Sequence, residues 1–277
     1  MKSSLSKTVR STFRLEERGV PEFKGTLFGI EIEMEGQVRV PDGKSANWRQ
    51  ERDGSLRGDG SREYVSRGAW DKKTAAAEIL ELYDNILKNK GTINNSMRAG
   101  VHIHLNMQDK TMMELFTFVA LYYVLEDTLI DMFGTEERVG NLFCLRLSDA
   151  SYTSEILATA IKSGAFAQYM TDNDEIRYSA LNLTSLSKYG SVEFRALQTP
   201  QDPRQILSWI DIIELILKGS QKFKTPEEVL NHLSADGVDN TLDLIGLPQL
   251  KNVPDYNDKI QKSIWATQFW VFSNEWK

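Results

Sequence analysis

Charged and aliphatic residues alternate strictly in three short stretches of the chain: 29–34 (GIEIEM), 101–106 (VHIHLN) and 192–196 (VEFRA). Successive side chains of a strand point to opposite faces, so a period of two predicts strands with one aliphatic and one polar face. If the three strands share one antiparallel sheet, their aliphatic faces can pack on helices and their polar faces combine into one charged surface. The residues of that surface are Glu31, Glu33, His102, His104, Glu193 and Arg195.

Apolar residues at helical spacing predict that helices fill much of the remaining chain, which makes the expected fold class α+β. The apolar run at 115–125 is shorter than the roughly 20 residues of a membrane span, so it predicts a buried core helix. Residues 177–183 and 191–197 are predicted to be two strands joined by a turn near 187–190. Helices are predicted over about 72–90, 111–134, 153–170, 202–219 with Asp202 as N-cap, a short segment from 226, and 257–277.

The chain divides into two predicted parts. Residues 1–24 are rich in Lys, Arg, Ser and Glu and have few apolar positions, which predicts a basic, loosely ordered arm. Its charge could serve solubility alone or contact an acidic partner. Residues 25–277 contain no repeat, low-complexity tract or linker, so they are predicted to form a single domain.

The composition of the chain indicates which partners and which cellular compartment to expect. The net charge of −6 provides no broad basic field, so a nucleic-acid partner is not expected. A single cysteine, Cys144, excludes an intramolecular disulfide and favours a reducing compartment. No apolar segment typical of a secretory signal opens the chain. We therefore expect a cytoplasmic protein with neither nucleic-acid nor membrane partners.

The polar residue types of the three strands suit a site for metal and phosphate. Carboxylates are ligands for Mg²⁺ or Mn²⁺, imidazole is acceptable to Mn²⁺, and the planar fork of an arginine matches phosphate oxygens. Each strand by itself could be an ordinary solvated face, the histidines could be structural, and Glu193 could pair only with Arg195. The three strands together, with two of the three histidines of the chain, favour a functional site.

The order of motifs resembles the amidoligase family, within the carboxylate–amine ligase superfamily that includes glutamine synthetase and glutamate–cysteine ligase. The resemblance covers about 27–217 and rests on FGIEIE, DGSLRGDGSREYVS, AGVHIHLN, and RYSALNL followed by SVEFRAL. It implies an antiparallel, glutamine-synthetase-like catalytic sheet with helices packed on one face. A second Asp-Gly-Ser at 59–61 leaves open whether this loop or the one at 53–55 faces the site.

The resemblance also implies roles for individual residues. Arg138 is more loosely similar to a substrate-side segment of the family. The implied metal ligands are Glu31, Glu33, Glu63, His102 and Glu193. The implied contacts to cofactor are His102, His104, Arg177, Asn182 and Arg195. The implied catalytic residues are Glu63, Arg177 and Arg195.

The implied reaction is ATP-dependent joining of a carboxylate substrate to an amine substrate through an acyl phosphate, with ATP and Mg²⁺ or Mn²⁺ as cofactors. The substrates could be small molecules, peptides or protein side chains, and a homo-oligomer is possible because relatives often share sites between subunits. Two alternatives stay open: a metal-dependent hydrolase that uses the same carboxylates, and a catalytically silent binding relative. Dependence on ATP separates the ligase from the hydrolase.

Overall fold

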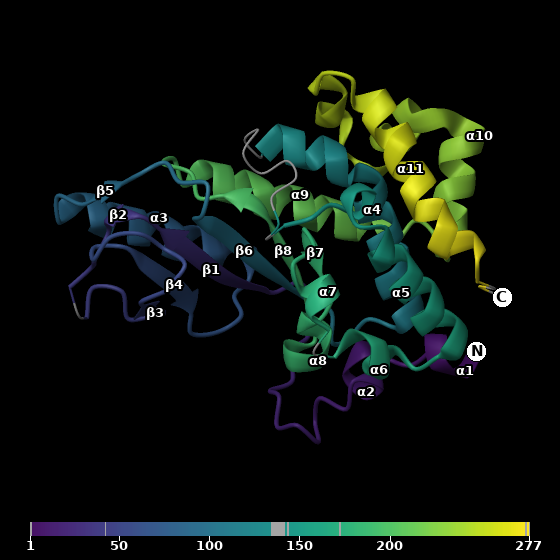
Figure 1. Ribbon diagram of the computed structural model, residues 1–277, viewed down its shortest axis with the longest axis horizontal. Helices are drawn as coiled ribbons and strands as arrows, with labels where there is room; N and C mark the ends of the chain where they lie inside the picture. Colours follow the sequence, from purple (N-terminus) through teal and green to yellow (C-terminus); the bar gives the residue numbers. More distant parts are fainter. Residues whose placement is uncertain are drawn as a thin grey trace.

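The computed structural model describes residues 2–41, 43–133, 142, 144–171, 173–274 and 276. Arg138 and the predicted end of a helix at Gly134 lie outside the described residues. A sheet occupies one end of the elongated molecule, and a group of helices occupies the other end, where both termini lie (Figure 1). Those helices are α4 (Met112–Phe133), α5 (Ser151–Ser163), α10 (Pro226–Ile245) and α11 (Tyr256–Phe272).

The main sheet has six strands, all paired antiparallel, which confirms the α+β class. The three alternating strands of the sequence are its adjacent central members, so their polar residues share one face. A second sheet of two strands pairs β2 (Gly36–Gln37) with β5 (Thr92–Ile93). The strand order of the main sheet is β3 (Trp48–Glu51), β4 (Arg62–Ser66), β1 (Phe28–Met34), β6 (Gly100–Asn106), β8 (Ser191–Gln198) and β7 (Leu181–Asn182).

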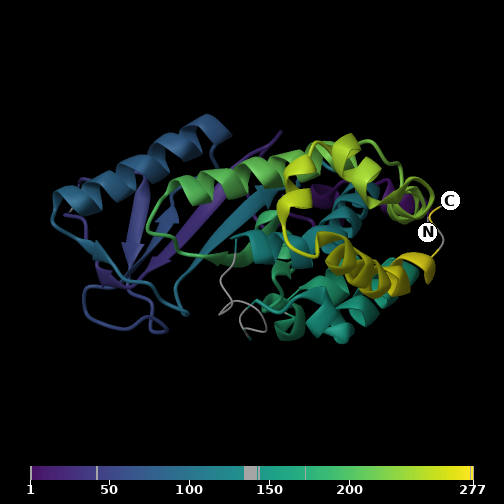
Figure 2. The ribbon, with the colours of Figure 1, turned by 90° about the horizontal axis from the view of Figure 1, so that it is seen from above.

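The aliphatic face of the sheet packs on helices, as the alternation predicts. Every second residue of β1, starting at Phe28, is fully buried. On β8, the ring of Phe194 lies 6.2 Å from Phe118 of α4 and 6.2 Å from Trp209 of α9 (Arg204–Ser220). Figure 2 shows α3 (Lys72–Lys88) and α9 lying along the same side of the sheet. The opposite, polar face is therefore left for the site.

The apolar run at 115–125 lies within α4, where it is buried, so the predicted core helix is confirmed. Helix α11 packs along α4, and α10 contacts both. Among the described residues, no helix is long and apolar enough to cross a membrane. Two short 3-10 helices, η2 (Leu147–Asp149) and η3 (Pro248–Asn252), connect these elements.

Several predicted boundaries differ from the structure. The single helix expected over 153–170 is divided into α5 and α6 (Phe166–Met170), because Gly164 between them has the left-handed φ of 68°. The helix expected to be short from 226 continues through a kink to Ile245. Asp202 does not occupy the N-cap position of α9, which is Pro203; instead it accepts a hydrogen bond from the Arg204 amide.

The strand predicted over 177–183 is mostly replaced by other structure. Helix α7 (Asp174–Arg177) occupies its beginning, and only Leu181–Asn182 form β7. The predicted turn near 187–190 contains α8 (Ser185–Tyr189), which ends at Gly190. Strands β7 and β8 are nevertheless antiparallel neighbours, as expected.

The N-terminal segment differs from the loosely ordered arm that its composition predicts. It forms α1 (Lys2–Leu5) and α2 (Val9–Thr12), and its apolar residues lie in the main core. Leu5 of α1, Val9 of α2 and Phe13, which follows α2, are all buried there. The abundance of charged and polar residues in the segment hides these few apolar positions. The division of the chain into an arm and a single catalytic domain stays a prediction.

Candidate functional site

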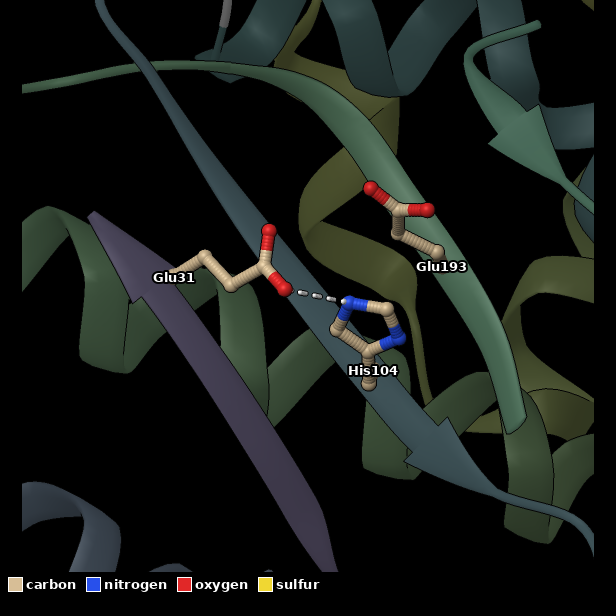
Figure 3. A group of neighbouring side chains, drawn as sticks. All are labelled: Glu31, His104 and Glu193. Carbon is tan, nitrogen blue, oxygen red and sulfur yellow. Dashed lines mark ion pairs between the residues drawn. The ribbon is translucent and has the colours of Figure 1, made fainter. Parts of the chain in front are cut away.

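The first group of site residues forms where β1, β6 and β8 run side by side. Glu31 lies directly opposite His102 in the register, and His104 lies opposite Glu193. Glu31 Oε1 is 3.3 Å from His104 Nε2, while Glu31 Oε2 is 3.3 Å from His102 Nδ1. His102 Nδ1 is also 3.5 Å from Glu193 Oε1. Figure 3 shows Glu31, His104 and Glu193 pointing toward one another from the three strands.

Glu193 is the most firmly held member of this group, being only 4% exposed. Its Oε2 accepts hydrogen bonds of 2.6 Å from Asn182 Nδ2 and of 3.0 Å from Ser185 Oγ. Its Oε1 pairs with the guanidinium of Arg195. Three donors from β7, α8 and β8 therefore orient one carboxylate toward the histidines, an arrangement typical of support around a metal ligand.

The second group contains only carboxylates. Glu33 of β1 lies opposite Glu63 of β4, and Asp53 from the preceding loop brings a third carboxylate within 4.8 Å of both. Glu33 Oε2 also accepts a hydrogen bond of 2.9 Å from the Gly100 amide. Three carboxylates at this separation repel one another unless a cation is bound or a proton is shared.

The first Asp-Gly-Ser loop, at 53–55, therefore faces the site. Asp53 also stabilises its own turn, because its Oδ1 accepts a hydrogen bond of 2.6 Å from the Ser55 amide. The second loop, at 59–61, stabilises the local backbone. Ser61 Oγ accepts a hydrogen bond from the Gly36 amide and donates one to the Arg57 carbonyl. The structure thereby answers the question that the repeated motif leaves open.

The pKa shifts follow from these contacts. Burial by itself would raise the pKa of Glu31, but hydrogen bonds and charge from His102 and His104 lower it far below its ordinary value. Burial opposes ionisation of Glu193 in the same way, and His104, Arg195 and His102 lower its pKa to about 2. In the second group, burial and the charges of Glu31, Glu33 and Asp53 raise the pKa of Glu63 to about 7.

The donor set fits a divalent cation at the first group. His104 Nδ1 lies 3.2 Å from Ser191 Oγ, while its buried Nε2 lies 3.3 Å from Glu31 Oε1. Nε2 therefore points to a carboxylate that could share a cation with it, and an imidazole whose other nitrogen is anchored is the usual form of a histidine ligand. The carboxylates of the second group suit Mg²⁺ or Mn²⁺.

Two cavities flank the first group, and both are lined by Glu31, His104 and Tyr189. The larger, about 720 Å³, is polar and is lined also by Arg177, Asn182, Glu193 and Arg195, besides others from β7 and α8. We call it the polar cavity. The smaller, about 200 Å³, is lined largely by apolar side chains, and we call it the apolar cavity. Its apolar lining residues include Phe23, Leu27, Val65 and Ala69.

Every predicted site residue that the structure describes lies at one of the two groups or on the wall of the polar cavity. Arg177 lies in α7 and lines that cavity, with its guanidinium 5.8 Å from the Tyr178 ring centroid. Asn182 and Arg195 line the same cavity while holding Glu193. His102 is buried between Glu31 and Glu193.

Some residues of the site are absent from the predicted set. Asp53 is one of them, although its Asp-Gly-Ser motif is among those that carry the family resemblance. No sequence pattern indicates Ser185, because the carboxylate to which it donates a hydrogen bond, Glu193, is eight residues away. Tyr189 ends α8 and carries no motif, yet its ring lies 5.6 Å from His104. His104 was predicted to contact cofactor, and the structure groups it with the potential metal ligands as well.

Comparison with protein families agrees with this geometry. A family model described as "Putative amidoligase enzyme" matches residues 70–217, more than half of the chain. The matched span includes β6 and β8, with His102, His104, Glu193 and Arg195, whereas β1 and the Asp53 loop precede it. No curated protein shows significant similarity to the chain. The resemblance inferred from the motifs is confirmed, and the chain belongs to the amidoligase family, whose name denotes a ligase-type enzyme.

Proposed function

We propose that this chain is an ATP-dependent carboxylate–amine ligase that forms an amide or peptide bond through an acyl phosphate. The observation that carries the proposal is the pair of acidic groups on one sheet face. Glu31 and Glu33 each belong to one group and are two residues apart on β1, which separates them by about 7 Å along the strand. The two groups are therefore neighbours on one sheet face, so cations held at both would contact one phosphate-bearing substrate.

Residues of the first group would hold one divalent ion through Glu31, His104 and Glu193, with His102 beside them. Glu33, Asp53 and Glu63 would hold a second. Ions bound in this way supply positive charge that offsets the charge developing on the transferred phosphoryl group. Binding of cations also removes the repulsion among the three carboxylates of the second group.

Arginines of the polar cavity complete the phosphate-binding side. Arg195 and Arg177 donate to phosphoryl oxygens, and the forked geometry of each guanidinium suits two oxygens at once. The apolar cavity, which shares Glu31 and His104 with the polar one, accepts the base of the nucleotide. One nucleotide could then extend across both cavities past the first group.

The proposed reaction has two steps. A carboxylate oxygen of the first substrate attacks the γ-phosphorus of ATP, and ADP leaves. The amine of the second substrate then attacks the acyl carbon, and inorganic phosphate leaves as the amide forms. Glu63, whose carboxylate lies in the second group, accepts the proton that the amine loses. No residue of the protein has to form a covalent bond to the substrate.

Calorimetric titration tests the proposal. Wild-type protein is expected to bind ATP only in the presence of Mg²⁺ or Mn²⁺. Glu31→Gln and Glu33→Gln should each abolish that binding, because each removes a charged ligand from one group. Glu155→Gln is the matched control: it changes an exposed carboxylate of α5, away from the sheet and outside both groups. Folding of each variant is checked by circular dichroism.

The outcomes separate the three possible functions. Metal-dependent binding of ATP, lost in both site variants, supports a ligase and justifies a screen of acid and amine pairs by phosphate release. Binding of metal without ATP favours the metal-dependent hydrolase. Absence of both from folded wild type leaves the silent binding relative and contradicts the proposal.

A further inference from the structure

The N-terminal segment 18–25 lies against the candidate site, although it precedes the part of the chain that the family model matches. Arg18 lines the polar cavity, and Phe23 lines the apolar cavity. Arg18 also donates a hydrogen bond to the Ser187 carbonyl of α8. Figure 1 shows this part of the chain as a loop that passes below α8.

Partly buried hydrogen bonds from two side chains hold the segment in place. Gln108, two residues beyond the end of β6 and 1% exposed, accepts from the Phe23 amide at 3.1 Å and donates to the Pro21 carbonyl at 3.1 Å. The same side chain donates to the Tyr189 carbonyl at 2.9 Å. Asn106, the last residue of β6, donates to the Gly25 carbonyl at 3.0 Å. Residues at and just beyond the end of β6, the strand that carries the histidines, thus position segment 18–25 and Tyr189, which line the two cavities.

The charge of the polar cavity exceeds what its carboxylates neutralise. Its described lining contains four cationic side chains and two carboxylates. Arg195 pairs with Glu193, and Glu31 faces the histidines. Two other cations of this lining are Arg18 and Lys188. Among the described side chains, no carboxylate forms a salt bridge with either of them. Both of these cations come from segments next to one another, since Arg18 contacts the residue before Lys188.

We infer that Arg18 is a ligand-binding residue of this site and that, with Lys188, Arg177 and Arg195, it forms a subsite for a ligand with several closely spaced anionic groups. The inference rests on the proposed function for the identity of the reaction. The shared chemistry has two sources: the phosphate chain of the nucleotide, or an acidic substrate with more than one carboxylate. Segment 18–25 is then a determinant of specificity that lies outside the family-matched region.

Titration calorimetry of Arg18→Ala and Arg18→Lys tests this inference with three probes: Mg²⁺-ATP, inorganic tripolyphosphate and tricarballylate. Loss of one charge-assisted hydrogen bond should weaken binding about tenfold in Arg18→Ala. Arg18→Lys should recover part of this loss, because it keeps the charge and loses the fork. Lys24→Ala is the matched control, since it removes a cation of the same segment that lines neither cavity.

Weaker binding of Mg²⁺-ATP and tripolyphosphate assigns Arg18 to the phosphate chain, and weaker binding of tricarballylate alone assigns it to an acidic substrate. Affinities equal to those of Lys24→Ala for all three probes overturn the inference, as does a wild type that binds none of them. Failure of the proposed function looks different. In that case metal-dependent binding of ATP is absent, while binding of the non-nucleotide anions still depends on Arg18.

Discussion

Asn182 Nδ2 donates a hydrogen bond of 2.6 Å to Glu193 Oε2, so a side chain that lines the polar cavity also orients a potential metal ligand. Both residues are almost fully buried, and they lie directly opposite one another in the pairing of β7 with β8. Two adjacent strands therefore contribute a ligand and its support. The first prediction concerns this pair.

Replacement of Asn182 by alanine should weaken binding of Mn²⁺ about tenfold, because outer partners of metal ligands typically contribute 10-fold to 100-fold in affinity. Titration calorimetry with MnCl₂ measures the change. Asn240→Ala, on the surface of α10, should leave the affinity unchanged. An Asn182→Ala variant that folds and binds Mn²⁺ as tightly as wild type would contradict a supporting function for this residue.

Gly190→Ala should destabilise the protein by at least about 2 kcal/mol, since overpacking and backbone strain combine there. Gly190 has a φ of +72°, and an added Cβ would lie 2.4 Å from Gln108 Cγ and 2.5 Å from Leu15 Cδ1. Gly246 provides a matched control, because its φ of +78° is similar and an added Cβ would meet only Leu215, at 3.8 Å. Urea unfolding of both variants separates crowding from strain; equal losses would show that crowding contributes nothing.

Gln108→Ala should release segment 18–25, because one side chain holds Pro21, Phe23 and the Tyr189 carbonyl. Loss of these three partly buried hydrogen bonds should cost about 2 kcal/mol of folding free energy. Limited digestion with trypsin should then cleave after Arg18 and Lys24 faster than in wild type, as mass spectrometry can detect. Gln168→Ala, at an exposed position of α6, should not change the cleavage rate. An unchanged cleavage rate in Gln108→Ala would show that other contacts are sufficient to hold segment 18–25 in place.

The stability of the protein should depend on pH through Glu126 of α4. Burial raises the pKa of this carboxyl well above its ordinary value, and the charge of Asp127 adds to the effect, although the Leu147 amide opposes it. A raised pKa means that the folded state binds the proton more tightly than the unfolded state. This contribution to stability is therefore complete below the unfolded pKa of about 4.5 and is lost as pH rises through the folded pKa.

Glu126→Gln should remove this dependence, because glutamine stays neutral at every pH. Relative to wild type, the variant should gain stability as pH rises from 5 to 9, measured as the shift in the urea midpoint. Glu155→Gln, at an exposed position of α5, should follow the wild-type profile. Parallel profiles for wild type and Glu126→Gln would show that Glu126 ionises without cost in the folded protein.

Much of the sheet could be predicted, because alternation is a local property of an extended backbone. Glu31, His102 and Glu193 were each expected on a polar strand face, and the structure has them on one shared face. The helices were less well delimited. Gly164 interrupts a predicted helix, because its left-handed conformation ends α5 and its amide donates a hydrogen bond to the Ile161 carbonyl. The spacing of apolar residues does not indicate such a break.

The polar cavity could not be predicted in the same way, because its walls come from segments far apart in the chain. Arg18 reaches Ser187, and Gln108 ties Phe23 to Tyr189. The basic composition of the first residues suggested a tail, since charge and polarity say nothing about a hydrogen bond made more than eighty residues away. Asp53 is a similar case. Its sequence neighbours, Gly54 and Ser55, indicate a turn, whereas the folded structure places its carboxylate beside those of Glu33 and Glu63.

The sequence by itself determined which chemical groups the sheet presents: carboxylates, imidazoles and a guanidinium on one face, with aliphatic residues beneath. This follows from the period of two, which every extended strand obeys. Only the tertiary structure decided which of these groups meet, by pairing Glu31 with His102, His104 with Glu193, and Glu33 with Glu63. Strand order and register depend on packing between distant segments, and that packing is a property of the whole chain.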